Sequence, residues 1–109
     1  MTKYNNSKYN GYDSKKEAKR ATELKLLEKA GEIRSLQEQI VYELIPAQYR
    51  VVGGKRKGIE RAMKYIADFQ YVDKSGNTVV EDTKGFRTEV YRIKKKLMLY
   101  IHDIQIKEV

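Results

Sequence analysis

The chain has 109 residues, which suits one compact domain with a modest hydrophobic core. It contains no cysteine, which excludes disulfides and thiolate metal sites, and a single histidine, which argues against histidine-rich zinc chemistry. The formal net charge of +8 favours a polyanionic partner, with nucleic acid ahead of a membrane surface.

Residues 1–12 are rich in Asn, Lys and Tyr and show no hydrophobic period. They predict a flexible arm, followed by a single domain over residues 13–109. The arm has no apolar signal segment, and no apolar run elsewhere approaches the length of a membrane span. A cytoplasmic protein without a membrane partner is therefore expected.

The first helix is predicted from Ser14 to Ala30. Ser14 suits the N-cap, Glu17 three residues later completes a capping box, and Gly31 suits the end of the helix. Apolar residues recur along one stripe of this helix, which we expect to face the core. They are Ala18, Ala21, Leu24 and Leu27.

The middle of the chain is basic and rich in glycine. Residues 40–45 predict a strand that ends at Pro46, the only proline. The segment 48–61 then places Lys55, Arg56 and Lys57 among three glycines. It is either a basic loop or the tip of a hairpin, and the sequence allows both interpretations.

The remaining elements complete a sheet. Residues 62–72 and 78–84 predict a β-hairpin with a turn at 73–77, and residues 104–109 predict a short final strand. Between them a second helix is predicted over residues 88–100, with one apolar face made of Val90, Ile93, Leu97 and Tyr100. The order α-β-β-β-α-β indicates an α/β (α+β) domain with a mixed central β-sheet flanked by two helices.

The predicted hairpin carries the strongest chemical signal. Side chains alternate along a strand, so Asp82 and Lys84 share one face. If the turn is centred on Ser75, Val72 pairs with Thr78, and the same register places Asp68 opposite Asp82. Two facing carboxylates among apolar neighbours repel each other unless a cation lies between them.

A divalent cation held by oxygen ligands meets this need, and Mg²⁺ or Mn²⁺ suits such ligands. With Lys84 placed to stabilise charge, the set fits phosphodiester hydrolysis. The alternative is that Asp68 is an edge-strand charge and that Asp82 and Lys84 form a solvated pair, since an acid–x–Lys string is common.

Two stretches resemble the PD-(D/E)xK nuclease superfamily: I-A-D-F at 66–69 and V-V-E-D-T-K-G at 79–85. Ala67 stands where that superfamily has proline. A longer likeness to small phage-encoded, nuclease-like proteins of unassigned function rests on four segments, two of which overlap these stretches. They are D-S-K-K-E-A (13–18), L-K-L-L-E-K-A-G-E-I (24–33), Y-I-A-D-F (65–69) and V-E-D-T-K-G-F (80–86).

The resemblance implies a restriction-endonuclease-like core, a phage or prophage origin in a bacterial host cell, and work on DNA. It also implies that Glu17 joins Asp68 and Asp82 as a metal ligand and catalytic residue, a role that competes with the capping box. Lys84 completes the expected catalytic set, and Thr83 is a fourth expected metal ligand.

The expected function is a Mg²⁺- or Mn²⁺-dependent DNA endonuclease. Cutting both strands needs two sites, so a homodimer is expected, and analogy with small dimeric resolvases favours branched DNA such as a Holliday junction. Two alternatives remain: a non-catalytic nucleic-acid-binding protein that retains the fold, and a small phage structural or adaptor protein. The residues expected to hold DNA are Lys15, Lys16, Lys55, Arg56, Lys57, Arg61, Arg87, Lys94 and Lys95.

Overall fold

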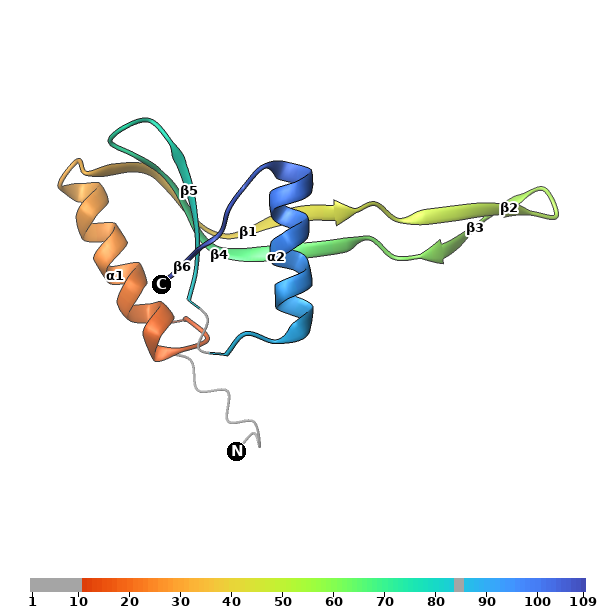
Figure 1. Ribbon diagram of the computed structural model, residues 1–109, viewed down its shortest axis with the longest axis horizontal. Coiled ribbons are helices and arrows are strands. Elements are labelled where there is room, and N and C mark those ends of the chain that lie inside the picture. The colour runs from red at the N-terminus through yellow and green to blue at the C-terminus, as the bar shows by residue number, and fades with distance from the viewer. Residues whose placement is uncertain (1–10, 84–85) are drawn as a thin grey trace.

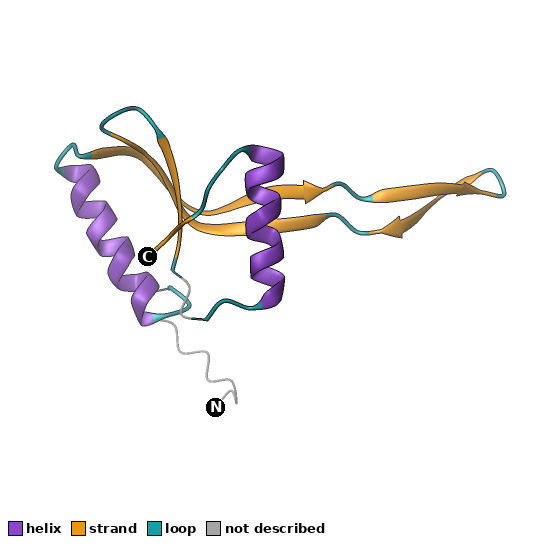
Figure 2. Cartoon of the chain, in the orientation of Figure 1, coloured by secondary structure: helices purple, strands orange, loops and turns teal. Residues whose placement is uncertain are grey.

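The computed structural model describes residues 11–83 and 86–109. Two helices accompany a mixed four-stranded sheet of order β1-β4-β5-β6, which confirms the predicted mixed α+β class (Figures 1 and 2). The ladders β1–β4 and β4–β5 are antiparallel, and β6 runs parallel to β5. The elements are α1 (Lys15–Lys29), β1 (Ile33–Ile45), β4 (Met63–Asp73), β5 (Thr78–Asp82), α2 (Glu89–His102) and β6 (Lys107–Glu108).

A separate two-stranded ribbon, β2 (Gln48–Val52) and β3 (Lys55–Glu60), occupies the segment for which the sequence allowed a loop or a hairpin tip. It adds two strands to the predicted order. Gly53 and Gly54 join them with φ values of 60° and 77°, as a tight hairpin turn with two left-handed residues requires. Figure 1 shows the ribbon continuing the line of β1 and β4 away from both helices.

The start of α1 follows the predicted cap, and α2 begins with a cap of the same kind. The Ser14 hydroxyl accepts a hydrogen bond from the Glu17 amide at 3.0 Å, and the Thr88 hydroxyl accepts one from the Tyr91 amide at 3.1 Å. Such caps satisfy backbone donors that the first turn of a helix leaves unpaired. No helix among the described residues has the length and apolar character to cross a membrane.

The predicted apolar face of α2 is wrong at three of its four positions, while the fourth, Leu97, packs against the core. Val90, Ile93 and Tyr100 are 61%, 50% and 87% exposed, whereas Tyr91 and Met98 are buried. The sequence pattern favoured the first set because it is uniformly apolar. Tyr91 can nevertheless bury its ring because its hydroxyl reaches Glu108 at 2.7 Å.

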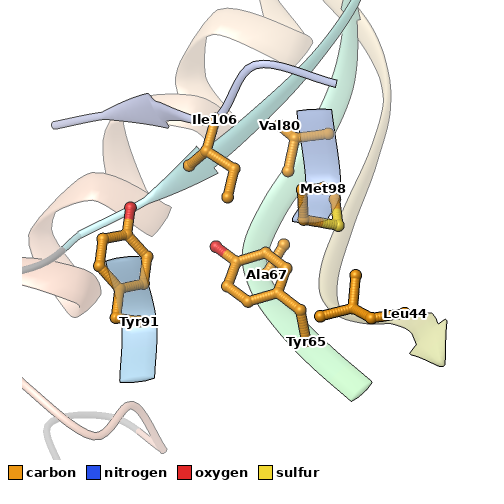
Figure 3. Close-up of a cluster of buried hydrophobic side chains, with 7 residues drawn as sticks. All are labelled: Leu44, Tyr65, Ala67, Val80, Tyr91, Met98 and Ile106. Atoms are coloured by element: carbon orange, nitrogen blue, oxygen red, sulfur yellow. The ribbon is translucent and has the colours of Figure 1, made fainter. Parts of the chain in front are cut away.

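The core consists of two clusters of buried side chains. One lies between the sheet and α2 (Figure 3) and contains Leu44, Tyr65, Ala67, Val80, Tyr91, Met98 and Ile106. The other lies against α1 and contains Ala21, Leu24, Ile33, Phe69 and Tyr71. Tyr12, placed in the predicted N-terminal arm, packs against this second cluster, while residues 1–10 lie outside the described part of the chain.

Candidate active site

The predicted register of the β4–β5 hairpin is confirmed. Val72 pairs with Thr78 and Phe69 with Glu81, so one further step along both strands brings Asp68 level with Asp82. The strand nevertheless ends at Asp82 instead of continuing to residue 84. The reason is local, because the amide and the hydroxyl of Thr83 both donate to Asp68 Oδ2 at 2.8 Å.

Thr83 therefore fixes the Asp68 carboxylate at the end of β5. Its amide bonds to a side chain instead of a backbone carbonyl, which stops the ladder. The Thr83 hydroxyl, expected as a metal ligand, points to Asp68. Thr83 would thus act on a bound metal indirectly, by holding the Asp68 carboxylate in position.

Asp82 lies deeper, with 1% of its surface exposed. The hydroxyl of Tyr65, itself buried, donates to Asp82 Oδ2. Burial and this hydrogen bond both raise the pKa of Tyr65, so the phenol stays protonated and remains a donor to the carboxylate. A buried carboxylate held in this way is fixed in orientation.

Glu17 reaches the same region from α1. Its side chain is 5% exposed, and the amide of Gln39 donates to Glu17 Oε2 at 2.9 Å. Gln39 has a left-handed φ of 55° and lies between the ladder pairs Glu38–Phe69 and Ile40–Ala67, which places it level with Asp68. The backbone amide of Glu17 thus takes part in the Ser14 cap of α1, while its side-chain carboxylate reaches the sheet.

The region carries an excess of negative charge. Burial raises the pKa of Glu17 to about 7, and repulsion from Asp68, Asp13 and Asp82 adds to the effect. An oxygen-rich, negatively charged set of this kind fits a hard divalent cation such as Mg²⁺. In the described part of the chain no group of three or more His, Cys, Asp or Glu side chains is close enough to hold a metal as it stands. An ion would therefore have to draw these carboxylates together.

Lys84 and Gly85 lie outside the described residues. The place of the expected catalytic ammonium thus remains a prediction from the sequence.

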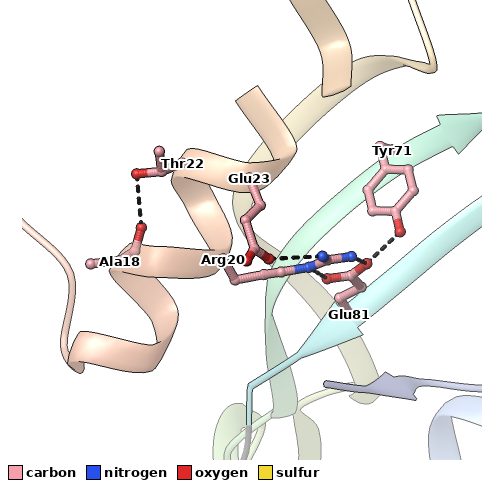
Figure 4. A network of polar contacts seen from close by, with 6 residues as sticks. All are labelled: Ala18, Arg20, Thr22, Glu23, Tyr71 and Glu81. Carbon is pink, nitrogen blue, oxygen red and sulfur yellow. Dashed lines mark hydrogen bonds and ion pairs between the residues drawn. The ribbon is translucent and has the colours of Figure 1, made fainter. Parts of the chain in front are cut away.

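The sequence analysis did not predict an ion pair beside this region, between the half-buried Arg20 and the buried Glu81 (Figure 4). Glu81 is fully buried, and Arg20 donates two hydrogen bonds to it, of 2.8 and 2.7 Å, while the Tyr71 hydroxyl also donates to it. Burial acts to raise the pKa of Glu81, but these hydrogen bonds hold it below its usual value. Burial and the same carboxylate raise the pKa of Tyr71 to about 12.

This ion pair ties α1 to β5. Arg20 follows Glu17 by three residues, about one helical turn, and Glu81 precedes Asp82. The ion pair between Arg20 and Glu81 therefore also sets the position of Glu17 relative to Asp82. The sequence offered one sign of this ion pair: Glu81 directly follows two valines in a predicted strand. A carboxylate that is buried in such a strand needs a partner.

Residues 1–108 match the family described as "Protein of unknown function (DUF1064)". The chain belongs to this family. No curated protein and no solved structure gives a significant match. The DUF1064 description assigns no activity.

The residues expected to hold DNA fall into separate groups. Lys15 and Lys16 are exposed at the start of α1, and Lys55, Arg56, Lys57 and Arg61 are exposed on and beside the ribbon. Lys94 is half-buried, while Arg87 and Lys95 both pair with Glu108. The hydrogen bonds from Arg87 and Tyr91 lower the pKa of Glu108 to about 2. A pocket at α2 and β6 is lined by the four basic side chains of Arg87, Arg92, Lys95 and Lys96.

Proposed function

We propose that this protein is a Mg²⁺- or Mn²⁺-dependent DNA endonuclease of the PD-(D/E)xK superfamily. The observation that carries the proposal is the approach of Glu17, Asp68 and Asp82 from α1, β4 and β5 to one end of the β4–β5 ladder. Each carboxylate is oriented by a polar neighbour of its own: Gln39, Thr83 and Tyr65, respectively. The chain's net charge of +8 suits a nucleic-acid substrate.

The three carboxylates would hold the metal. A bound divalent cation would lower the pKa of a coordinated water and neutralise charge on the phosphate oxygens. Gln39, Thr83 and Tyr65 would act as positioning residues that keep the carboxylates in place. Lys84, directly after Thr83 in the chain, is expected to supply an ammonium that stabilises charge in the transition state.

The test is a cleavage assay on supercoiled plasmid with Mg²⁺, Mn²⁺ or EDTA. We expect metal-dependent cleavage that Asp82→Asn abolishes while DNA binding is retained. Asp103→Asn is the matched control, because Asp103 is exposed at the end of α2 with a φ of 57° that Asn also adopts readily. Equal cleavage by wild type and Asp82→Asn would refute the proposed site.

The preferred substrate is branched DNA, and the preferred state is a symmetric dimer. The exposed apolar residues Val90, Ile93 and Tyr100 on α2 support an interface with a second copy. Sedimentation is expected to show a dimer that Ile93→Glu dissociates. A four-way junction is expected to bind more tightly than a linear duplex, and equal affinity for the two would count against resolvase activity.

The second candidate is a nucleic-acid-binding protein without catalysis. It is favoured by the absence of a preassembled metal-ligand cluster among residues 11–83 and 86–109. Salt-sensitive DNA binding without cleavage in every metal would support it.

A further inference from the structure

The side chains of the β2–β3 ribbon take no part in the packing of the core. Every residue of both strands is exposed, including Val51 at 75%, Val52 at 57% and Ile59 at 48%. A two-stranded ribbon without a buried face is only marginally stable in water. Its anchorage to β1 and β4 keeps it extended, but none of its own side chains contributes to either core cluster.

The ribbon also concentrates positive charge. Residues 48–60 contain four basic side chains and one acidic side chain, Glu60. Arg50 lies directly opposite Lys57 in the ladder, and Lys55 lies opposite Val52. Like charges placed opposite each other destabilise a strand pair. Among the described residues none of Arg50, Lys55 and Lys57 has an acidic partner within ion-pair distance.

Tyr49 and Arg56 hold each other on the ribbon. The Arg56 guanidinium lies 3.9 Å from the centroid of the Tyr49 ring, a cation–π contact that orients the guanidinium without neutralising it. The ribbon is therefore a narrow, extended arm whose cations lack acidic partners among the described residues. Its shape and its charge are complementary to a groove between two rows of phosphates.

We propose that the β2–β3 ribbon enters the major groove of B-form DNA. Two strands lie about 4.8 Å apart, and a groove about 12 Å wide admits a two-stranded ribbon with its side chains. The five residues of β2 span about 17 Å at about 3.4 Å each. The deep, narrow major groove of A-form RNA excludes such an arm. The inference rests on the proposed function only in taking DNA as the substrate.

The test measures binding in EDTA, where no metal-dependent cleavage can occur. A fluorescent DNA duplex of about 24 base pairs, just over two turns of B-form DNA, is titrated with wild type and two triple variants that each remove three positive charges. The ribbon variant carries Arg50→Gln, Lys55→Gln and Lys57→Gln. The distal variant carries Lys29→Gln, Arg34→Gln and Lys74→Gln, which are exposed and lie near the α1–β1 and β4–β5 turns, at the end of the molecule opposite to the ribbon (Figure 1).

We expect the ribbon variant to bind at least about tenfold more weakly and the distal variant to change by less than about threefold. The slope of log affinity against log salt should fall by about 0.9 for each phosphate that the variant no longer neutralises. Bound wild type should protect guanine N7 atoms in the major groove from dimethyl sulfate, and the ribbon variant should not. Duplex RNA of the same sequence should bind more weakly than the DNA.

Equal weakening in the two triple variants, or unchanged binding by the ribbon variant, would overturn the inference. So would equally tight binding of duplex RNA, or a change of oligomeric state in the ribbon variant, which would indicate a second copy as the occupant. If wild type binds through the ribbon but cleaves nothing with any metal, the proposed function fails and this inference stands. If wild type cleaves and the ribbon variant binds normally, this inference alone fails.

Discussion

Charged side chains are buried and hydrogen-bonded at the α1–β5 contact, whereas they are exposed on the β2–β3 ribbon. At the contact, Glu17, Glu81 and Asp82 are buried, and each accepts a hydrogen bond from a neighbouring side chain. On the ribbon, Arg50, Lys55 and Lys57 are exposed and without acidic partners among the described residues. Charges fixed inside a fold can orient a reacting group, whereas charges left in solvent are available to another molecule.

The difference also explains how a strongly basic chain can carry an acidic centre. The net charge of +8 is spread over exposed side chains, while the carboxylates gather where burial raises the pKa of Glu17. A polyanion would be attracted by the surface, and a cation would be attracted by the centre. Substitutions at the α1–β5 contact should therefore change the stability of the fold strongly. Substitutions on the β2–β3 ribbon should change binding only.

The largest effect on stability is expected from Arg20→Ala. It leaves Glu81 buried without its guanidinium partner, and removing one member of a buried ion pair costs about 3–5 kcal/mol. Urea unfolding measures this decrease in stability. The double variant Arg20→Leu/Glu81→Leu should recover most of it, because an apolar pair of similar volume is often nearly neutral. A decrease below about 1 kcal/mol, the range of surface pairs, would show that this contact does not secure α1.

A smaller, pH-dependent effect is expected from Glu17→Gln in metal-free protein. The folded state raises the pKa of Glu17 from 4.5 to about 7, so it binds the proton more tightly than the unfolded chain does. Stability from this group is present below pH 4.5 and is lost as the pH rises through 7. Glu17→Gln should therefore be more stable than wild type at about pH 8, by on the order of 2 kcal/mol, and not at about pH 4.

Urea unfolding in EDTA at the two pH values measures this difference. Glu32→Gln, in an exposed ion pair with Lys74, is the control and should keep the pH dependence of wild type. If Glu17→Gln and wild type show the same pH dependence, Glu17 does not carry the raised pKa.

The smallest effect on stability is expected on the ribbon. Val51→Ser should change the free energy of unfolding by less than about 0.5 kcal/mol, because the side chain is exposed and packs against no core cluster. Val80→Ser, at a fully buried valine of the neighbouring sheet, is the contrasting variant and should cost more than about 1 kcal/mol. Equal decreases in stability would mean that the ribbon takes part in the core.

Features that depend on near neighbours in the chain were predictable. The capping residue Ser14 and the turn around Ser75 determine the start of α1 and the register that brings Asp68 level with Asp82. The predicted first strand begins only at residue 40, whereas β1 begins at Ile33. The alternation of exposed and half-buried residues is interrupted at Ser35, and one of the half-buried positions before residue 40 is the charged Glu38. The ribbon could not be distinguished from a loop because its strands have no buried side to produce such an alternation.

Interactions between distant residues were not predictable from the pattern. Arg20 and Glu81 are 61 residues apart, and neither residue type indicates the other. Gln39 lies just before the predicted strand at 40–45, and nothing in the sequence pattern indicates that its amide reaches Glu17. The buried face of α2 was missed because the hydroxyl of Tyr91 reaches Glu108 across a separation of 17 residues.

Direct titration with Mn²⁺, followed by calorimetry, tests the metal site without requiring a substrate. Wild type and Asp103→Asn should bind the ion saturably and gain thermal stability with it, since a ligand that prefers the folded state stabilises that state. Asp82→Asn should show neither response. Binding that is equally weak in all three proteins, or equally strong in all three, would contradict the assignment of Glu17, Asp68 and Asp82 as a metal site.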